Sequence, residues 1–316
     1  MCLFPRLIKN KRYQPNKKNG GQPPFCDDYR KLYVPVGCGK CIECMKQKAL
    51  QWKIRLLEEL KVQNHAYYIT FTFSPDSLKK LCEESGLKEC NAIAGIAIRR
   101  YLERWRKTYK KSQRHWFITE LGHEGTERIH LHGIVFSPFP IEKATFERYW
   151  QYGNIRIGDY CNLKTINYIA KYITKLDRDH KNYVPEIFCS AGIGNGYTNR
   201  PLVRQIHKFR EDKTTEFYRF PAGNKANLPI YYRNKLFTEE QREKLWIHKL
   251  DKNTRWVLGT EITNTDTYEG EDRYFRVLKV AQEKNLNLGY GDSTQEWKKK
   301  EYNVTRRMLI KGAAQQ

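Results

Sequence analysis

The sequence predicts an α+β fold in which a central antiparallel sheet carries helices on one face. A cysteine module precedes this core, and a helical extension follows it. Segments with strand and helix periodicity follow one another in the order β-α-β-β-α-β-α between residues 66 and 176. Two of the strands are joined by a short glycine-containing link, which is typical of an antiparallel hairpin.

Each strand is predicted from alternation and from β-branched or aromatic residues, as in the segment AYYITFTF. The predicted strands span residues 66–73, 116–121, 128–136 and 154–157. Ser74, Pro75 and Asp76 end the first strand, and Gly122 and Gly125 mark the hairpin link.

Each helix is predicted from apolar residues that recur every three or four positions. The predicted helices span residues 42–63, 92–111, 140–150 and 163–176. Thr238 and Gln241 have the spacing of a capping box for a further helix over residues 239–250. The glycines of residues 190–197 lack the strand and helix that flank a nucleotide-binding loop, so we interpret this segment as a turn.

We expect three segments along the chain: a basic arm with the cysteines and a helix (1–63), the sheet core (64–180) and an extension that contacts DNA (181–316). Residues 1–33 are basic, rich in Asn, Gly and Pro, and without periodicity, which predicts an extended arm. The motif GxxxxGK[ST] is absent from the sequence, which argues against a fused P-loop helicase.

The charge of the chain favours a polyanionic partner. The chain has 58 Lys and Arg against 35 Asp and Glu, a formal net charge of +23. Each phosphate that such a surface neutralises releases counterions, which drives binding of nucleic acid. The 21 Tyr, 14 Phe and 7 Trp could also stack on unpaired bases.

The sequence predicts a protein of the reducing cytoplasm rather than a membrane or secreted protein. The start, MCLFPRLIKNKRY, has too few apolar residues for a signal peptide, and no apolar stretch reaches the length of a membrane span. The nine cysteines are an odd number, which favours free or metal-bound thiols over a disulfide framework.

Two histidines on one strand form a candidate metal site. Alternate side chains of a strand share a face, so His130 and His132 of IHLHGIVF point the same way. The alternative is a pair of hydrogen-bonded core histidines. Glu120 is the first choice for a third ligand because it ends the neighbouring strand, provided that the hairpin register brings it to the same face. His123 and Glu124 are substitutes.

Mixed imidazole and carboxylate ligands suit Mn²⁺ or Mg²⁺. Such an ion would polarise a scissile phosphate and neutralise the charge that develops on it.

Two tyrosines on one helix form a candidate nucleophile pair. In NYIAKYITK, the residues Tyr168, Lys171, Tyr172 and Lys175 form one stripe. An isoleucine-rich stripe on the opposite side is expected to dock on the sheet. The alternative is an ordinary amphipathic helix with tyrosines at its boundary. Attack of a tyrosine on a phosphodiester would give a 5′-phosphotyrosine and a free 3′-OH, so that rejoining needs no ATP.

The pKa of a free phenol is about 10, so the nucleophile requires activation near neutral pH. A metal-bound phosphate and the neighbouring Lys171 would favour the phenolate in the transition state. The second tyrosine could then attack another strand while the first stays loaded.

These motifs resemble a known family. His130-Leu131-His132 is similar to the His-hydrophobic-His motif of HUH endonucleases, and Tyr168-Ile-Ala-Lys-Tyr172 is similar to the YxxKY motif of their two-tyrosine rolling-circle initiators. The strongest likeness is to the replication initiation proteins of gokushovirus-like microviruses. It extends over most of residues 30–240 and includes CGKCIEC and GIGNGY.

The resemblance implies the HUH fold, an RRM-like palm, and nicking of the viral strand at a duplex origin in the bacterial cytoplasm. A host polymerase would extend the 3′-OH with the help of a host helicase. By this likeness His130 and His132 are metal ligands, Tyr168 and Tyr172 are nucleophiles, and Lys171 is the lysine between them. Glu120 corresponds to an acidic position ahead of the histidines.

A second candidate metal site is the cluster Cys38-Gly-Lys-Cys41-Ile-Glu-Cys44, whose spacing lets thiolates converge on one zinc ion. Cys26 is the first choice for the fourth ligand, and Cys2 is the second. Ordinary thiols, or a redox or iron–sulfur role, are the alternatives.

Two rival functions remain at this stage. One is a plasmid relaxase or transposase that uses the same chemistry. The other is a non-catalytic nucleic-acid-binding protein with a zinc module, which would have the same charge and aromatic content.

Overall fold

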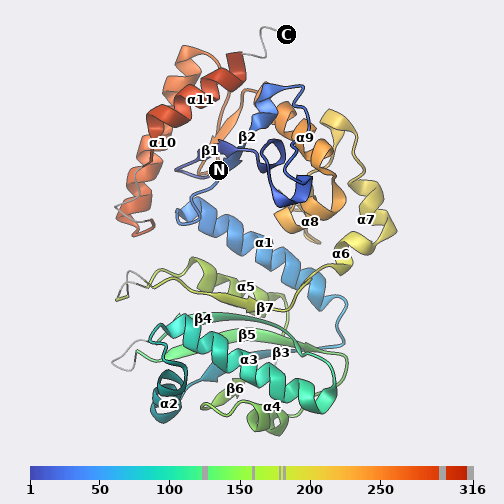
Figure 1. Cartoon of the computed structure of the whole chain (residues 1–316), viewed down its shortest axis with the longest axis vertical. Helices are drawn as coiled ribbons and strands as arrows, with labels where there is room; N and C mark the ends of the chain where they lie inside the picture. The colour runs from blue at the N-terminus through green and yellow to red at the C-terminus, as the bar shows by residue number, and fades with distance from the viewer. Residues whose placement is uncertain (123–126, 159–160, 178, 181–182, 292–296, 312–316) are drawn as a thin grey trace. The chain divides into compact units, whose positions relative to one another are not determined.

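The computed structural model describes every residue except 123–126, 159–160, 178, 181–182, 292–296 and 312–316 (Figure 1). The chain divides into two compact units, Lys48–Val203 and Met1–Gln47 with Arg204–Gln316. The segment 1–63 therefore contributes to both units. None of the helices in the described part of the chain has the length and apolar character needed to cross a membrane.

The unit Lys48–Val203 is built on a five-stranded antiparallel sheet. Its strand order is β6-β3-β5-β4-β7. The strands are β3 (His65–Thr72), β4 (Arg114–Leu121), β5 (Ile129–Ser137), β6 (Ile155–Ile157) and β7 (Ile187–Cys189). The predicted α+β class, the antiparallel sheet and the β4–β5 hairpin are confirmed. The prediction missed β7, because three residues at a sheet edge are too few to show an alternation.

The helices of this unit follow the predicted order, with one addition. They are α1 (Ile42–Leu60, which begins in the other unit), α2 (Pro75–Ser85), α3 (Cys90–Tyr109), α4 (Lys143–Tyr149), α5 (Leu163–Thr174) and α6 (Gly196–Asn199). The prediction missed α2. The segment that ends β3 also begins this helix, because Ser74 Oγ accepts from Ser77 N (3.2 Å) and Pro75 occupies the first turn.

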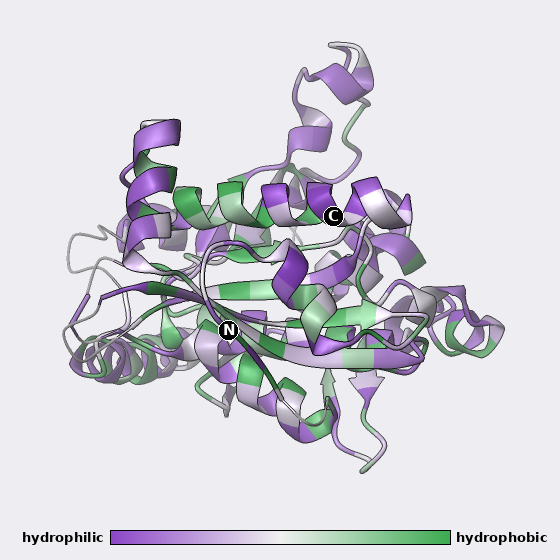
Figure 2. Cartoon of the chain, turned by 90° about the horizontal axis from the view of Figure 1, so that it is seen from below, coloured by the Kyte–Doolittle hydropathy of each residue, from purple (hydrophilic) through white to green (hydrophobic). Residues whose placement is uncertain are grey.

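The prediction that helices cover one face of the sheet was wrong, because they cover both (Figure 1). On one face, Phe71 and Leu131 pack with α3 and α4. On the other face, Ile134 and Phe136 pack with α1 and α5. Strand β5 is apolar on both sides, so each side requires a cover. Figure 2 shows this pattern, with mostly hydrophobic colour on the central strands and mixed colour on the surrounding helices.

Gly133 of β5 is required by close packing. A Cβ atom at this position would lie 2.2 Å from Phe117 Cδ1 and 2.3 Å from the Trp116 carbonyl oxygen. The glycine directly after His132 therefore lets β4 and its aromatic side chains lie close against β5.

The glycine-rich segment 190–197 forms a turn, as predicted, and α6 follows it. Buried Glu59 holds this turn: its Oε2 accepts from Gly194 N (2.7 Å) and from Arg114 Nη2 (2.8 Å). Arg114 Nη2 also donates to the carbonyl oxygen of Gly192 (2.8 Å). One carboxylate of α1 thus links the turn to β4.

The second unit contains short strands and longer helices around its own core. Its two-stranded sheets are β1 (Arg6–Lys9) with β2 (Tyr33–Val36), β8 (Phe217–Arg219) with β9 (Lys225–Asn227), and β10 (Arg255–Val257) with β11 (Thr260–Ile262). Its α-helices are α8 (Ile230–Leu236), α9 (Glu239–Asp251), α10 (Tyr268–Asn287) and α11 (Lys299–Lys311), and α7 (Pro201–Ile206) spans the boundary between the units. Short 3-10 helices span Lys11–Tyr13, Lys17–Asn19, Tyr29–Leu32 and Glu211–Lys213.

Two predictions meet the structure in this unit. The capping box of Thr238 and Gln241 is present at the start of α9, as predicted. The extended arm over residues 1–33 was wrong. Arg12 Nη1 and Tyr13 OH both donate to Glu243 Oε2 of α9 (3.1 and 2.9 Å), so the polar residues of this segment bind a carboxylate of the same unit.

Replacing Glu59 with Gln should destabilise the sheet unit by about 1.5–3 kcal/mol at pH 7, since a charged hydrogen-bond acceptor is lost. Burial raises the pKa of Glu59, but the hydrogen bonds from Arg114 and Gly194 outweigh burial and bring the net pKa below its ordinary value. The contribution is therefore complete above the unfolded pKa of about 4.3 and is lost as pH falls through the lower folded pKa.

Urea unfolding of both proteins at pH 7 and at progressively lower pH measures this difference. Glu103→Gln is the control, because this exposed carboxylate makes one long ion pair (4.0 Å) with Lys107. Equal losses for the two variants, or a Glu59→Gln loss that stays constant with pH, would contradict the assignment.

Candidate active site

The histidine pair lies at the centre of the sheet on one face. In the β5 register, His130 is opposite Thr72 of β3 and Glu120 of β4, and His132 is opposite Thr70 of β3. Directly opposed residues share a face, so all of these side chains project to the side covered by α5. The two imidazole rings are nearly parallel, with 6.5 Å between their centroids and 24° between their planes.

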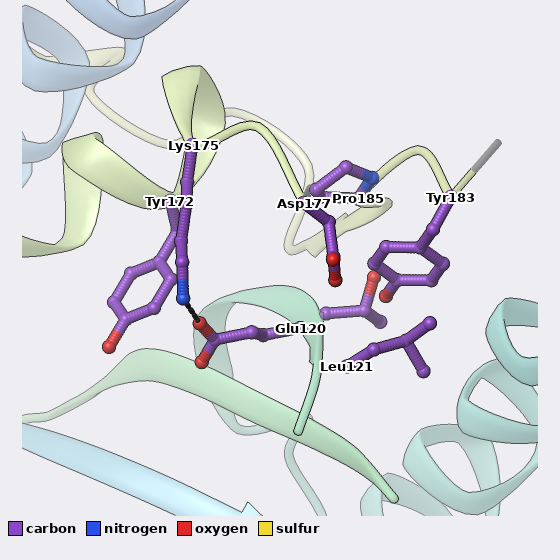
Figure 3. Close-up of a pocket in the computed structure, with 8 residues that line it drawn as sticks. Glu120, Leu121, Tyr172, Lys175, Asp177, Tyr183 and Pro185 are labelled. Carbon is purple, nitrogen blue, oxygen red and sulfur yellow. Dashed lines mark hydrogen bonds and ion pairs between the residues drawn. The ribbon is translucent and has the colours of Figure 1, made fainter. Parts of the chain in front are cut away.

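Glu120 lies on the histidine face, which is the condition that its candidacy required. Its Oε2 accepts from His132 Nε2 (2.7 Å), and its Oε1 accepts from the ammonium group of Lys175 (Figure 3). Burial raises the pKa of Glu120, but the hydrogen bonds from His132 and Lys175 outweigh it, so the net pKa lies below its ordinary value. The carboxylate is therefore ionised at neutral pH.

Both imidazoles are oriented by hydrogen bonds. Because the Glu120 carboxylate can only accept, Nε2 of His132 carries a proton, and Nδ1 of the neutral ring accepts from Tyr68 OH (3.2 Å) and Thr70 Oγ1 (3.1 Å). Burial and then the proximity of His132 hold the pKa of His130 below its ordinary value, although a hydrogen bond to the Arg128 backbone opposes this. His130 is thus neutral at pH 7.

Helix α5 brings the two tyrosines onto the same face. It begins with a capping box in which Asn162 Oδ1 accepts from Lys164 N and Thr165 N. Its buried residues Ile166, Ile169 and Ile173 pack against the sheet, as the predicted docking stripe required.

The Tyr172 ring stacks on His132, with 4.3 Å between the centroids and 10° between the planes. Its hydroxyl group lies 2.7 Å from the hydroxyl group of Tyr168, and the Tyr168 ring is 47% exposed. Burial, the hydrogen bond with Tyr168 and the charge of Glu120 raise the pKa of Tyr172 well above its ordinary value. Tyr168 is thus the more accessible phenol of the pair.

The two lysines of the predicted stripe differ in position. Lys175 lies at the site: it forms an ion pair with Glu120, and its ammonium nitrogen is 5.9 Å from the centroid of the Tyr172 ring. Lys171 is exposed, and its side chain makes no hydrogen bond or ion pair with any residue that the structure describes. Sequence reasoning placed Lys175 on the stripe but missed its contact with Glu120.

A small pocket adjoins the ion pair (Figure 3). Its lining comprises Thr119, Glu120, Leu121, Tyr172, Lys175, Asp177, Tyr183 and Pro185. The Asp177 carboxylate accepts from the backbone N (2.9 Å) and from Nδ1 (3.0 Å) of His180. Sequence reasoning missed Tyr68, Thr70 and Asp177, because only the folded sheet brings these residues near the histidines. The substitute ligands His123 and Glu124 lie outside the described residues.

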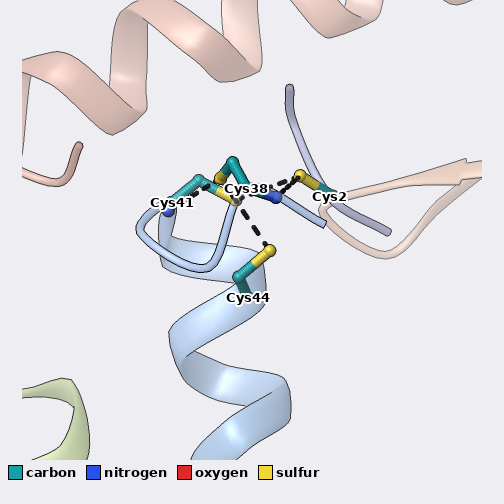
Figure 4. A group of neighbouring side chains, drawn as sticks. All are labelled: Cys2, Cys38, Cys41 and Cys44. Atoms are coloured by element: carbon teal, nitrogen blue, oxygen red, sulfur yellow. Dashed lines mark hydrogen bonds between the residues drawn. The ribbon is translucent and has the colours of Figure 1, made fainter. Parts of the chain in front are cut away.

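The cysteines form a separate group in the other unit (Figure 4). The Sγ atoms of Cys2, Cys38, Cys41 and Cys44 lie within 4.8 Å of one another. Cys26, the first choice for the fourth ligand, is not in this group, because its thiol donates to the Asp28 carbonyl oxygen (3.0 Å). Among the described residues, His130, His132 and Glu120 do not form so tight a group.

This site defines a class of protein: an antiparallel sheet with paired histidines, faced by a helix with paired tyrosines. Residues 66–177 match a family model of phage-type replication-associated proteins, the ORF2 family. The chain is 24% identical over 222 residues to the replication-associated protein VP4 of Bdellovibrio phage phiMH2K. That match covers 62% of this chain and 66% of the relative, just under two thirds of the relative's length.

No solved structure matches the chain. The family model and the relative together confirm the resemblance to phage replication initiation proteins that the motifs predicted.

Replacing Ile169 with Ala should weaken the docking of α5 and lower the free energy of unfolding by about 2–5 kcal/mol, because Ile169 is fully buried. Leu163→Ala is the control on the same helix, since Leu163 is 50% exposed, and we expect a change within about 0.5 kcal/mol. Urea unfolding measures both values. Similar losses for the two variants would show that the isoleucine stripe does not hold the helix.

Proposed function

We propose that the chain is a metal-dependent endonuclease and strand transferase that starts and ends rolling-circle replication of a small single-stranded DNA phage genome. The observation that carries this proposal is the stacking of the Tyr172 ring on His132, at 4.3 Å, while Glu120 binds the same imidazole. Candidate nucleophiles and candidate metal ligands thus share one face of one sheet.

The donors on this face fit a divalent ion. The imidazoles of His130 and His132 and the carboxylate of Glu120 are of the type that Mn²⁺ and Mg²⁺ accept. His132 is oriented at Nδ1 by Tyr68 and Thr70, as ligating histidines are oriented by a partner at their other nitrogen. When bound, the ion would polarise the scissile phosphate and neutralise developing charge.

The reaction transfers a phosphoryl group twice. The phenolic oxygen of a tyrosine attacks phosphorus, the bond to the 3′ oxygen breaks, and this oxygen leaves as a 3′-OH while the tyrosine keeps the 5′-phosphate. In the reverse reaction a 3′-OH attacks the phosphotyrosine, the new phosphodiester forms and the phenol is regenerated. The number of phosphoester bonds is unchanged, so no nucleotide is consumed.

We propose that Tyr168 attacks first and Tyr172 second. The exposed ring of Tyr168 is accessible to DNA, whereas Tyr172 is half-buried on His132 and its pKa is raised. The 2.7 Å between the two phenolic oxygens allows Tyr172 to receive a strand from nearly the same place.

The setting of the proposed reaction is the cytoplasm of the bacterial host. The substrates are single-stranded DNA and origin duplex DNA, and a host helicase and a host DNA polymerase would extend the 3′ end. The formal charge of +23 supports phosphate binding that does not depend on any one site residue.

Labelled single-stranded fragments that tile the genome encoding the chain should be cleaved in Mn²⁺ and left intact in EDTA. Cleavage should leave a protein–DNA adduct, seen as a shifted band on denaturing gels. Tyr168→Phe should abolish the first adduct, Tyr172→Phe should keep the adduct and lose strand transfer, and the double variant should lose both. DNA binding should be retained in all three variants, because the phosphate contacts come from many Lys and Arg residues.

An adduct formed by the double variant would exclude both tyrosines as nucleophiles. Salt-sensitive binding of every fragment without cleavage in Mn²⁺ would instead favour a non-catalytic nucleic-acid-binding protein.

We also propose that Lys175, rather than Lys171, supplies the positive charge at the reacting phosphate, because its ammonium group lies at Glu120 and near the Tyr172 ring. Lys175→Met should lower the single-turnover cleavage rate by about 10²-fold or more, as removal of a transition-state charge partner does, with the Kd for DNA nearly unchanged. Lys171→Met is the matched control and should change the rate by much less. The opposite order of effects would support the role that the family resemblance implies for Lys171.

A further inference from the structure

The four-cysteine group has the dimensions of a single metal centre. Two Sγ–Sγ distances, Cys38 to Cys44 and Cys41 to Cys2, are 3.9 Å, and all four sulfurs lie within 4.8 Å of one another (Figure 4). Zinc binds cysteine sulfur at about 2.3 Å, so the edge of a tetrahedron of thiolates is about 3.8 Å. The observed spacing therefore leaves room for one ion among the sulfurs.

The backbone around the sulfurs is arranged to stabilise thiolate charge. The Cys38 amide donates to Cys2 Sγ (3.1 Å), and the Cys41 amide donates to Cys38 Sγ (3.3 Å). The amides of Phe4 and Leu3 donate to Cys2 Sγ (3.3 Å) and Cys41 Sγ (3.5 Å). Hydrogen bonds from N–H groups to sulfur favour the ionised, metal-binding form of cysteine.

Two glycines give the loop its shape. A Cβ atom at Gly37 would lie 2.9 Å from Cys44 Sγ, so a side chain there would press on the group. Gly39 has φ +80°, a conformation that glycine adopts without strain. The pattern VGCGKCIEC thus bends the chain so that three sulfurs face Cys2.

The group sits against the core of its own unit. Leu3 and Cys41 are fully buried and pack with Tyr274 and Leu278 of α10. Gln282 Nε2 of the same helix donates to the Leu3 carbonyl oxygen (2.7 Å). The first residues of the chain are thereby held on α10.

The start of α1 is held on α10 as well. The amide of Ile42, the first residue of α1, donates to Oδ1 of the buried Asn285 (2.8 Å). The sulfur group thus lies where the chain start and the start of α1 both meet α10.

We propose that Cys2, Cys38, Cys41 and Cys44 hold one structural Zn²⁺ that fixes the chain start and the beginning of α1 to α10. All four positions around the ion are filled by protein ligands, which is typical of a structural rather than a catalytic zinc site. Binding would displace a proton from each thiol that is still protonated, and no electron transfer is involved.

Two other uses of the thiols fit the geometry less well. A disulfide needs about 2.05 Å between sulfurs, and the observed distances are almost twice that value. An iron–sulfur cluster places its thiolates around several iron and sulfide ions and so needs a wider spacing than one ion does.

The test uses the full-length chain purified under reducing conditions. We expect one zinc ion per chain by elemental analysis, and exchange into Co²⁺ should give the visible absorption bands of tetrahedral cobalt thiolate. Cys2→Ser should lose the metal and these bands, or bind with at least a tenfold weaker affinity. Cys26→Ser is the matched control and should keep both, since Cys26 is a half-buried thiol outside the group.

A second measurement serves if Cys2→Ser fails to fold. Titration of the wild-type chain with a zinc chelator should release the ion and lower the temperature at which the unit with residues Met1–Gln47 and Arg204–Gln316 unfolds, because metal binding adds to folding free energy. Absence of bound zinc together with absence of the cobalt bands would overturn the proposal. Iron in place of zinc, or equal metal loss in Cys26→Ser, would overturn it too.

Discussion

Ile166, Ile169 and Ile173 dock α5 on the sheet face that bears His130 and His132, and the geometry of the candidate site depends on this packing. Tyr168 and Tyr172 have no position of their own relative to the histidines; they take it from the isoleucines on the opposite side of the same helix. A fully buried stripe fixes a helix in both rotation and height, because cores are close-packed. The stacking of Tyr172 on His132 is the result at the site.

The charges of the site are arranged around Glu120. Its two oxygens bind the His132 imidazole and the Lys175 ammonium group, so one carboxylate links the central hairpin to the end of α5. A divalent ion at the histidines would compete with Lys175 for this carboxylate. Under the proposed function, the released ammonium group would be free to meet the incoming phosphate, which couples metal binding to preparation of the site for DNA.

Residues with a local signal could be predicted from the sequence, and residues with partners far along the chain could not. The spacing of His130 with His132 and of Tyr168 with Tyr172 determines a shared face once the strand and the helix are recognised. Glu120 depended on a hairpin register that the link does not reveal, so it could be named only conditionally. The structure supplies that register, with Glu120 opposite His130.

The errors have identifiable physical causes. Cys2 joins the other cysteines because α10 and the β10–β11 pair form a core under Leu3, and no sequence spacing shows this. Helices cover both faces of the sheet because β5 is apolar on both sides, a pattern visible in IHLHGIVF that was used only to infer a central strand. Helix α2 was missed although Ser74 and Pro75 are ordinary signals for a helix start.

The most direct test of the central claim is to identify the residue that becomes linked to DNA. The wild-type chain would be loaded with a cleaved single-stranded fragment in Mn²⁺, digested with nuclease and protease, and analysed by tandem mass spectrometry. We predict a nucleotide attached through its 5′-phosphate to Tyr168, with Tyr172 as the second acceptor. Attachment to a residue outside α5, or cleavage that leaves no covalent adduct, would contradict the account.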